Sequence, residues 1–170
     1  MDFEIKGDKI RLINTILSDI DKIIEFENLN NKYIHQYSKN KHLELIKNND
    51  CLHLSIKRIY DDKLIGHMIS FGVEDPNKVL EFRRISINEK GFGYGREAIQ
   101  LLKKICFETL KFHRLWFDVY DDNQRAIGLY ESEGFIKEAL LRENIKTDNG
   151  YRSQRIYSML ENEYMQKDYT

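Results

Sequence analysis

The sequence predicts a mixed α/β fold, with a mostly antiparallel sheet of about seven strands, one central parallel strand–helix–strand crossover and helices on both faces. Strand-like runs joined by short turns and a hairpin signal between two closing strands predict the sheet. A helical segment between two strands predicts the crossover. Because the 170 residues contain no repeat, low-complexity stretch or proline/glycine-rich linker, we expect residues 1–170 to form one domain.

The N-terminal part predicts one short strand and two helices. The strand is expected over 9–13. Helices are expected over 19–28 and 41–48, where apolar residues recur at roughly helical spacing.

Three strand-like runs follow, over 52–60, 63–72 and 79–87. They are joined by Asp61-Asp62 and by Glu74-Asp75-Pro76-Asn77, two compositions typical of turns. Connections this short make neighbouring strands antiparallel. This part of the sheet is therefore expected to be an antiparallel meander.

The pattern then switches to a helical period over 95–110 and returns to a strand over 113–120. A helix between two strands of one sheet makes those strands parallel. The runs over 79–87 and 113–120 are therefore the expected parallel pair.

The C-terminal part predicts one more helix and a hairpin. The helix is expected over 122–133 and ends at Gly134, because glycine readily takes the left-handed conformation that stops a helix. Strands are expected over 135–144 and 151–160, on either side of the hairpin signal Thr147-Asp148-Asn149-Gly150.

Composition and charge exclude several classes of function. The formal net charge is −1, so the chain lacks the excess of Lys and Arg that binding to a phosphate backbone requires, and we expect no nucleic-acid partner. Cys51 and Cys106 are too few for a zinc site or a disulfide framework, and the five histidines show no ligand spacing, so we expect no metal. No segment approaches the roughly 18 apolar residues of a membrane span, and the N-terminus has no apolar signal segment. We therefore expect a cytoplasmic protein with no membrane partner.

A glycine-spaced turn, Lys90-Gly91-Phe92-Gly93-Tyr94-Gly95, precedes the 95–110 helix. Glycines at every second position let backbone N–H groups converge on an anion, and a helix N-terminus adds about half a positive charge. Lys90 and Arg96 supply flanking cations. The turn favours a pyrophosphate ligand, although a glycine triplet alone is equally typical of a flexible loop at a helix entry.

The same glycines also fit a dinucleotide fingerprint, Gly93-x-Gly95-x-x-Ala98, with Asp118 near the distance expected of a ribose-binding acid. A nicotinamide domain repeats strand–helix units to build a parallel sheet, whereas only one crossover is predicted here. Asp118 also lies inside a strand-like run rather than at its end. A kinase-type phosphate loop is excluded because no Gly-Lys-Ser or Gly-Lys-Thr follows. The order of elements therefore disfavours a nicotinamide cofactor.

A second motif, Asn-x-x-Ala-x-x-Leu-Tyr-x-x-x-Gly-Phe, runs from Asn123 to Phe135. Together the two motifs resemble the GNAT superfamily of acetyl-CoA-dependent N-acetyltransferases, and look closest to its spermidine/diamine and ribosomal-protein N-acetyltransferase branch. The match is specific from about Glu81 to Phe135. It implies direct transfer of an acetyl group from acetyl-CoA to a primary amine of a polyamine, another small amine or a protein N-terminus. A non-catalytic acyl-CoA-binding or sensing module is the alternative.

The resemblance also implies which residues hold the cofactor. The backbone amides of 91–96 would bind the pyrophosphate, with Lys90 standing where the family usually has Gln or Arg. The preceding strand would pair with the pantetheine arm, which Asn123 would also contact, and Tyr130 would lie near the coenzyme sulfur. The implied cofactor-binding residues are Ile85, Ile87, Lys90, Gly91, Phe92, Gly93, Tyr94, Gly95, Arg96, Asn123 and Tyr130.

Tyr130 and Glu81 are the catalytic residues that the resemblance implies. A phenol has a pKa of ~10 and is protonated at neutral pH, so Tyr130 would donate a proton to the departing thiolate. An alkylammonium acceptor, with a pKa of ~10.4, must first lose a proton, and Glu81 lies where some family members place a general base. Glu81 is equally typical of a strand carboxylate paired with Arg83 or Arg84. Cys106 lies on an apolar helix face and is expected to be a buried structural thiol.

The sequence leaves the acceptor open between a small-molecule amine and a peptide N-terminus. Asp19, Asp21, Glu25 and Glu27 gather in the first predicted helix, where their negative field would favour a cationic amine. A solvated acidic helix face is the more ordinary interpretation of such a cluster. A homodimer is also left open.

Overall fold

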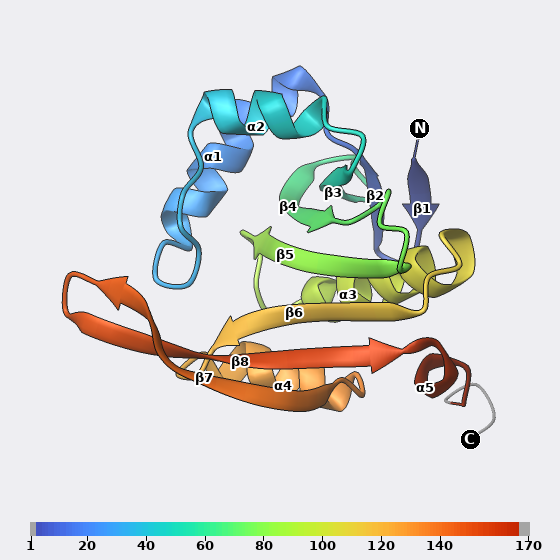
Figure 1. The fold of residues 1–170 in the computed structure, drawn as a ribbon. Coiled ribbons are helices and arrows are strands. Elements are labelled where there is room, and N and C mark those ends of the chain that lie inside the picture. Colours follow the sequence, from blue (N-terminus) through green and yellow to red (C-terminus); the bar gives the residue numbers. More distant parts are fainter. Residues whose placement is uncertain (1–2, 167–170) are drawn as a thin grey trace.

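The structure is a computed structural model that describes residues 3–166 (Figure 1). Within these residues eight strands form one sheet, in the order β1-β2-β3-β4-β5-β6-β8-β7, and only β5 and β6 are parallel neighbours. The predicted class, a mostly antiparallel mixed sheet with one central crossover, is therefore confirmed. The strands are β1 (Glu4–Lys6), β2 (Ile10–Asn14), β3 (Cys51–Arg58), β4 (Leu64–Phe71), β5 (Val79–Ile87), β6 (Arg114–Tyr120), β7 (Ile136–Thr147) and β8 (Gly150–Leu160).

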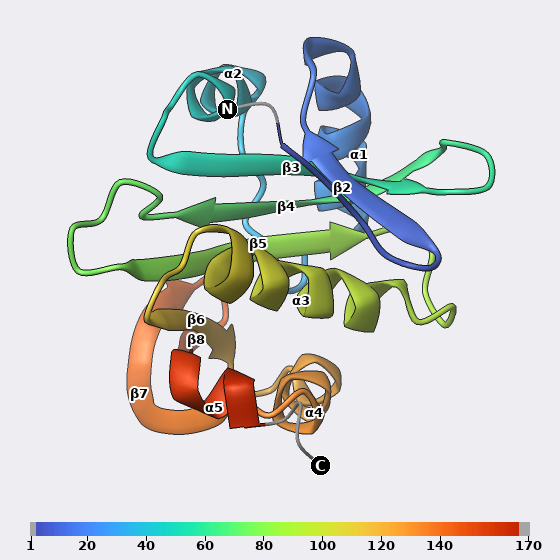
Figure 2. The ribbon, with the colours of Figure 1, turned by 90° about the vertical axis from the view of Figure 1, so that its right-hand side faces the viewer.

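Helices cover both faces of the sheet. The helices α1 and α2 pack on one face and α3 on the other (Figure 2), and α4 lies beside α3, where Arg96 donates to the Ser132 hydroxyl at 3.0 Å. None of the helices within residues 3–166 is long and apolar enough to cross a membrane. The α-helices are α1 (Ile20–Leu29), α2 (Lys39–Ile46), α3 (Tyr94–Lys104), α4 (Gln124–Ser132) and α5 (Glu161–Gln166).

Several element boundaries differ from the sequence-based expectation. The α2 helix begins two residues early, because the Ser38 hydroxyl accepts the Lys41 N–H at 3.2 Å and caps the first turn. The segment predicted as one helix over 95–110 is α-helical only to Lys104 and continues as a π-helical turn, Ile105–Thr109. Cys106 lies in this turn and is fully buried, and the burial raises the pKa of its thiol to about 12.

A β-bulge in β5 decides which side chains reach each face of the sheet. Ile69 of β4 pairs with Arg84 and Ser70 pairs with Phe82, so Arg83 is an extra residue in β5. Before the bulge, Phe82 packs against Tyr130 of α4, with ring centroids 6.3 Å apart. After it, Arg84 points toward α1 instead. Without the extra residue the strand alternation would have kept Phe82 and Arg84 on one face.

The parallel strands β5 and β6 separate along their length. They pair only from Val79–Glu81 to Arg114–Trp116, yet β5 continues to Ile87 and β6 to Tyr120. The later part of β5 therefore keeps backbone N–H and C=O groups that no β6 residue bonds. This separation opens a cleft between the carboxyl ends of the two strands.

Candidate active site

A cavity of about 900 Å³ occupies the cleft between β5 and β6. It runs from the glycine turn at the start of α3, along β5 and α4, to the connection between α1 and α2. Volumes of this size are typical of small-molecule sites. The expected site residues among its lining are Ile85, Ile87, Lys90, Gly91, Gly93, Tyr94, Gly95, Arg96, Asn123 and Tyr130.

The glycine turn forms one end of the cavity and exposes backbone donors. Gly91 and Gly93 have φ angles of 88° and 82°, in the left-handed region that favours glycine. Gly93 is the N-cap of α3 and has no side chain to bond the first helical amides. The N–H groups of Tyr94, Gly95 and Arg96 therefore have no intrahelical acceptor, and the helix dipole adds positive potential there. An anion such as a phosphate group fits this end of the cavity.

The third glycine of the turn has a different role. Gly95 does not adopt a positive φ, and a methyl group at its Cα would lie 3.8 Å from atoms of Ile87 and Leu129, an ordinary van der Waals distance. Phe92, which was expected to bind cofactor, is not among the cavity-lining residues; its ring is exposed and stacks on that of Tyr94, with centroids 5.5 Å apart. The turn is braced from outside by Lys9, whose Nζ donates to the Phe92 carbonyl at 3.1 Å.

The two cations that flank the turn differ in their partners. Arg96 donates to Glu133 at 2.6 Å, and Glu133 also pairs with Lys103 at 2.8 Å. Lys90 is exposed at the cavity mouth and forms no ion pair with the residues that the structure describes. The charge of Arg96 is thus partly compensated, whereas that of Lys90 remains available to an anionic ligand.

Asn123 and Tyr130 enter the cavity from the ends of α4. The Asn123 side chain caps the helix, because its Oδ1 accepts the Ala126 N–H at 3.3 Å, and its amide NH₂ group is left for a ligand. The Tyr130 ring is 7% exposed and packs on Phe117, with centroids 4.3 Å apart. Burial, together with the nearby carboxylate of Asp118, raises the pKa of the Tyr130 phenol. The phenol therefore stays protonated at neutral pH and can act as a hydrogen-bond donor.

The structure does not bring Glu81 into the cavity lining. Its two carboxylate oxygens accept from Nε and Nη2 of Arg83 at 2.6 and 2.8 Å. This is the ion pair that the sequence analysis gave as the alternative to a base. The Arg83 side chain does line the cavity and thus presents the pair to it.

The structure places another carboxylate, Asp118 of β6, in the cavity wall. Gln154 of β8 donates to its Oδ1. The side chain faces the open cleft, but the cleft walls crowd its carboxyl group; this desolvation, together with the Glu81 charge, raises the pKa of Asp118. From the sequence alone, Asp118 fits only the ribose-binding acid of a nicotinamide site. The alternation of buried Phe117 and Val119 around it was the signal that it points to the opposite side of the strand.

The far end of the cavity is formed by the connection between α1 and α2 and by the bulged part of β5. Asn30, Tyr33, Ile34 and His35 line it together with Arg84. Among residues 3–166, no group of three or more His, Cys, Asp or Glu side chains is arranged to hold a metal ion.

Comparison with known proteins places this geometry in a family context. Residues 18–135 match the model of the family described as Acetyltransferase (GNAT) family. The chain is 26% identical over 144 residues to the spermidine N(1)-acetyltransferase of Vibrio cholerae. The aligned region covers 84% of this chain and 76% of the relative. It is also 26% identical over 119 residues to the probable N-acetyltransferase YjcK of Bacillus subtilis. This aligned region covers 69% of this chain and 66% of the relative.

A solved structure supports the fold. The dodecameric structure of spermidine N-acetyltransferase from Vibrio cholerae superposes with a TM-score of 0.82 at 22% identity, covering 95% of this chain and 99% of that one. At this identity the likeness concerns the fold.

Proposed function

The chain belongs to the acetyltransferase (GNAT) family, and we propose that it transfers an acetyl group directly from acetyl-CoA to a primary amine of a small molecule or a peptide N-terminus. The observation that carries the proposal is one continuous cavity that joins the glycine turn, the unpaired part of β5, Tyr130 and Asp118. An anion site, an extended-chain site and two proton-transfer groups are the parts that acyl transfer from a coenzyme A thioester needs.

The donor end fits acetyl-CoA, which supplies the activated acetyl group. The first-turn amides of α3 and the exposed Lys90 suit the pyrophosphate. The unpaired backbone groups of β5 around Ile85 and Ile87 suit the amide-containing pantetheine arm, which would pair with them as an added strand does. Asn123 adds a side-chain amide on the opposite wall.

The acceptor must lose a proton before its nitrogen can attack, because an alkylammonium has a pKa of ~10.4. Asp118 is the carboxylate better placed to take this proton, directly or through water, since it lines the cavity and its raised pKa makes it a stronger base. Glu81 remains the second candidate, and in that role it would act from behind Arg83.

Tyr130 is proposed to protonate the departing thiolate. Its phenol lines the cavity, stays protonated at neutral pH and is fixed by packing against Phe117. The neutral amine nitrogen adds to the acetyl carbon and a tetrahedral oxyanion forms. When the carbonyl re-forms, the carbon–sulfur bond breaks, the thiolate takes the phenol proton of Tyr130, and the excess proton on the new amide nitrogen passes to the tyrosinate. The oxyanion that develops on the acetyl oxygen would accept from an N–H on the unpaired part of β5.

The lining carboxylates favour an acceptor with one ammonium group in the cavity. At the acceptor end these carboxylates are Asp118 and Asp122, and Asp122 pairs with Arg152 at 2.6 Å. Asp118 alone is therefore available to a cation. Spermidine, which names the relative from Vibrio cholerae, is an acceptor to test against monoamines and peptide N-termini.

We also propose that the enzyme is cytoplasmic and self-associates. Cys51 and Cys106 are free thiols, which suits a reducing cytoplasm. Self-association is supported by the dodecameric structure of a fold neighbour and by apolar side chains exposed along the edge strand β7, among them Leu140 and Leu141. Light scattering of the purified protein would give the number of copies.

A thiol-release assay with acetyl-CoA tests the central claim. The panel would hold spermidine, a simple monoamine, glycinamide and a short peptide with a free N-terminus. Release that depends on one of these amines supports the proposal, with a single-ammonium acceptor expected to be fastest. Binding of acetyl-CoA by calorimetry without amine-dependent release across the panel would instead identify a non-catalytic acyl-CoA-binding module.

A further inference from the structure

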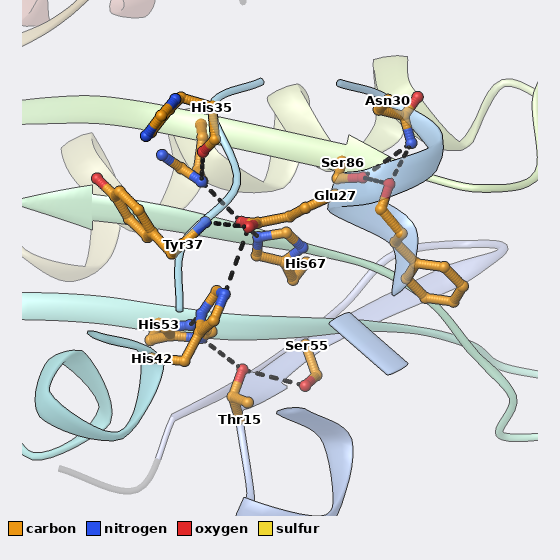
Figure 3. Close-up of polar contacts among 12 residues, drawn as sticks. Thr15, Glu27, Asn30, His35, Tyr37, His42, His53, Ser55, His67 and Ser86 are labelled. Carbon is orange, nitrogen blue, oxygen red and sulfur yellow. Dashed lines mark hydrogen bonds and ion pairs between the residues drawn. The ribbon is translucent and has the colours of Figure 1, made fainter. Parts of the chain in front are cut away.

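A buried ionic cluster lies between α1, α2 and the strands β3 to β5 (Figure 3). We name it the Glu27 cluster. It comprises Glu27 of α1, His42 of α2, His53 of β3, His67 of β4 and Arg84 of β5. Glu27, His42 and His67 are each 0% exposed. The interpretation of Glu27 as part of a solvated acidic helix face is therefore wrong, because its side chain turns inward while Glu25 stays in solvent.

Both oxygens of Glu27 are held by donors from different elements. Oε1 accepts from Nη1 of Arg84 at 2.7 Å and lies 3.1 Å from Nε2 of His67. Oε2 accepts the backbone N–H of Tyr37 at 2.8 Å and lies 3.4 Å from Nε2 of His42. Burial alone would raise the pKa of Glu27, but these hydrogen bonds outweigh it and lower the pKa, so the side chain is a carboxylate.

One chain of hydrogen bonds sets which ring nitrogens of His53 and His42 carry a proton. Ser55 has one hydroxyl proton, which the Asp19 carboxylate takes at 2.8 Å, so the Ser55 oxygen must accept from Thr15. The Thr15 oxygen is then free to accept Nδ1–H of His53 at 2.9 Å. This leaves Nε2 of His53 as the acceptor for Nδ1–H of His42, also at 2.9 Å. A neutral His53 fits its buried position, because burial lowers the pKa of this histidine to about 3.

The cluster reaches the cavity through Arg84 and the segment that follows α1. Arg84 also donates to the His35 carbonyl at 2.9 Å, and its guanidinium lies 3.5 Å from the centroid of the Tyr37 ring. His35 and Arg84 both line the cavity, whereas Glu27 does not. One carboxylate thus bonds the strand that carries the bulge and the loop that faces it.

Within the part of the chain that the structure describes, no other contact of comparable strength ties this loop to β5. Asn30 donates to the Ser86 hydroxyl at 3.0 Å, a neutral hydrogen bond at the beginning of the loop. From there to Ser38 at the start of α2, the bonds that tie residues 31–37 to β5 within the described structure all involve Arg84. Because hydrogen bonds to a charged group contribute more than neutral ones, Glu27 and Arg84 dominate the link between the loop and β5, while Arg152 of β8 separately donates to the Lys32 carbonyl at 3.0 Å.

We propose that Glu27 is a positioning residue that sets the affinity for the amine acceptor, by fixing Arg84 and residues 33–37 as one wall of the cavity. The inference rests on the proposed transfer to an amine. Glu27 touches neither substrate nor reacting atoms. The donor end is held independently, through α3, Lys9 and Glu133. Loss of the Glu27 carboxylate should therefore loosen the acceptor wall and leave acetyl-CoA binding intact.

Glu27→Gln is the direct test, with Glu25→Gln as its matched control. A glutamine has one acceptor oxygen, so either Arg84 or the Tyr37 N–H loses its partner. Glu25 lies on the same helix, is exposed and pairs only with Lys22 among the described residues, at 2.7 Å. In Glu27→Gln we expect the acceptor KM, measured with the panel amine that the wild type turns over fastest, to rise about tenfold or more, while the KM for acetyl-CoA changes less than about twofold.

Hydrogen–deuterium exchange provides a second measurement that needs no turnover. Exchange over residues 30–38 should accelerate about tenfold in Glu27→Gln and in Arg84→Lys, with exchange over residues 90–96 unchanged. Glu25→Gln should match the wild type in both segments. Equal KM values and equal exchange in the two glutamine variants would overturn the inference, as would a loss of kcat with both KM values unchanged, which indicates only fewer folded molecules. Absence of amine-dependent thiol release in the wild type would instead overturn the proposed function, and the exchange experiment would still decide the position of the loop.

Discussion

The Arg83 guanidinium bonds both carboxylate oxygens of Glu81, at 2.6 and 2.8 Å, from a position only two residues later in the same strand. Residues two apart in a strand lie on the same face, which lets the two side chains meet, and Arg83 is also the extra residue of the β5 bulge. The contact pairs the Glu81 carboxylate with a cation, whereas the Asp118 carboxylate on the neighbouring strand accepts a hydrogen bond from the neutral side-chain amide of Gln154. Of the two carboxylates near the cavity, Glu81 is thus bonded to a cation and Asp118 to a neutral amide.

This difference predicts which carboxylate takes the proton of the acceptor. We expect Asp118→Asn to lower kcat/KM about 100-fold or more, because it removes the base that lines the cavity, and Glu81→Gln to lower it less than about tenfold. Steady-state thiol release across a range of pH would measure both variants. The reverse order of the two effects would restore Glu81 as the general base.

Tyr130 is expected to act through its hydroxyl and not through its ring. Because phenylalanine keeps the packing against Phe117, Tyr130→Phe should slow turnover about 100-fold and leave the Kd for acetyl-CoA within about twofold. Tyr157→Phe is the control, since its hydroxyl bonds Glu131 at 2.6 Å and does not line the cavity. Equal effects of the two substitutions on turnover would exclude Tyr130 as the proton donor.

The glycine turn predicts different outcomes at two neighbouring glycines. Gly93→Ala forces a side chain into a φ of 82° and should lower the free energy of unfolding by about 1–2 kcal/mol, with weaker binding of acetyl-CoA. Gly95→Ala has no such backbone strain and its methyl group meets only ordinary contacts, so it should change stability by less than about 0.5 kcal/mol. Urea denaturation of both variants measures the difference. A Gly95→Ala loss as large as that of Gly93→Ala would contradict this account.

The buried histidines predict that stability falls as the pH decreases. Burial, with His67 and His42 beside it, lowers the pKa of His53 from 6.5 to about 3, so between these values the unfolded chain binds a proton that the folded chain does not. Stability from this group is therefore present above about pH 6.5 and is lost on acidification, by about 1.4 kcal/mol between pH 7.5 and 5.5. The lowered pKa of His67 acts in the same direction.

Urea denaturation at these two pH values tests this sign and size. His53→Gln should reduce the pH-dependent loss by about 1.4 kcal/mol, whatever its effect at pH 7.5. His113→Gln removes an exposed histidine and should leave the loss unchanged. A stability that rises on acidification from pH 7.5 to 5.5 would show that the buried histidines are charged in the folded protein.

The fold and the position of the glycine turn were largely predictable, because local patterns encode them. Turn residues between short strands predicted the antiparallel meander, and the glycine spacing predicted the start of α3 to within one residue. The strand β1 was not predicted, because its three residues, Glu4–Lys6, are too few to show the alternation of apolar and polar side chains that marks a strand. The helix α5 was not predicted, because its six residues directly follow β8 and no turn-forming residues separate the two elements.

The end of the cavity proposed to bind the acceptor was less predictable, because distant residues build it. His53 and His67 come together only through the β3–β4 register, which pairs Ser55 with His67 and brings His53 to the diagonal position. Their spacing in sequence carries no such information. Glu27 differs from Glu25 only in which side of α1 it occupies, and the core that covers it comes from strands 40 or more residues later in the chain.

The bulge at Arg83 separates the cavity wall proposed to contact the coenzyme from the wall proposed to contact the amine acceptor. One strand delivers Phe82 to the wall shared with Tyr130 and, after a single inserted residue, delivers Arg84 to the wall shared with the α1–α2 connection. Substitutions in that connection are therefore expected to change the preferred amine while the half proposed to hold the coenzyme keeps its geometry. A library confined to residues 30–38 is accordingly the economical route to new acceptor specificities, provided that Glu27 and Arg84 stay fixed.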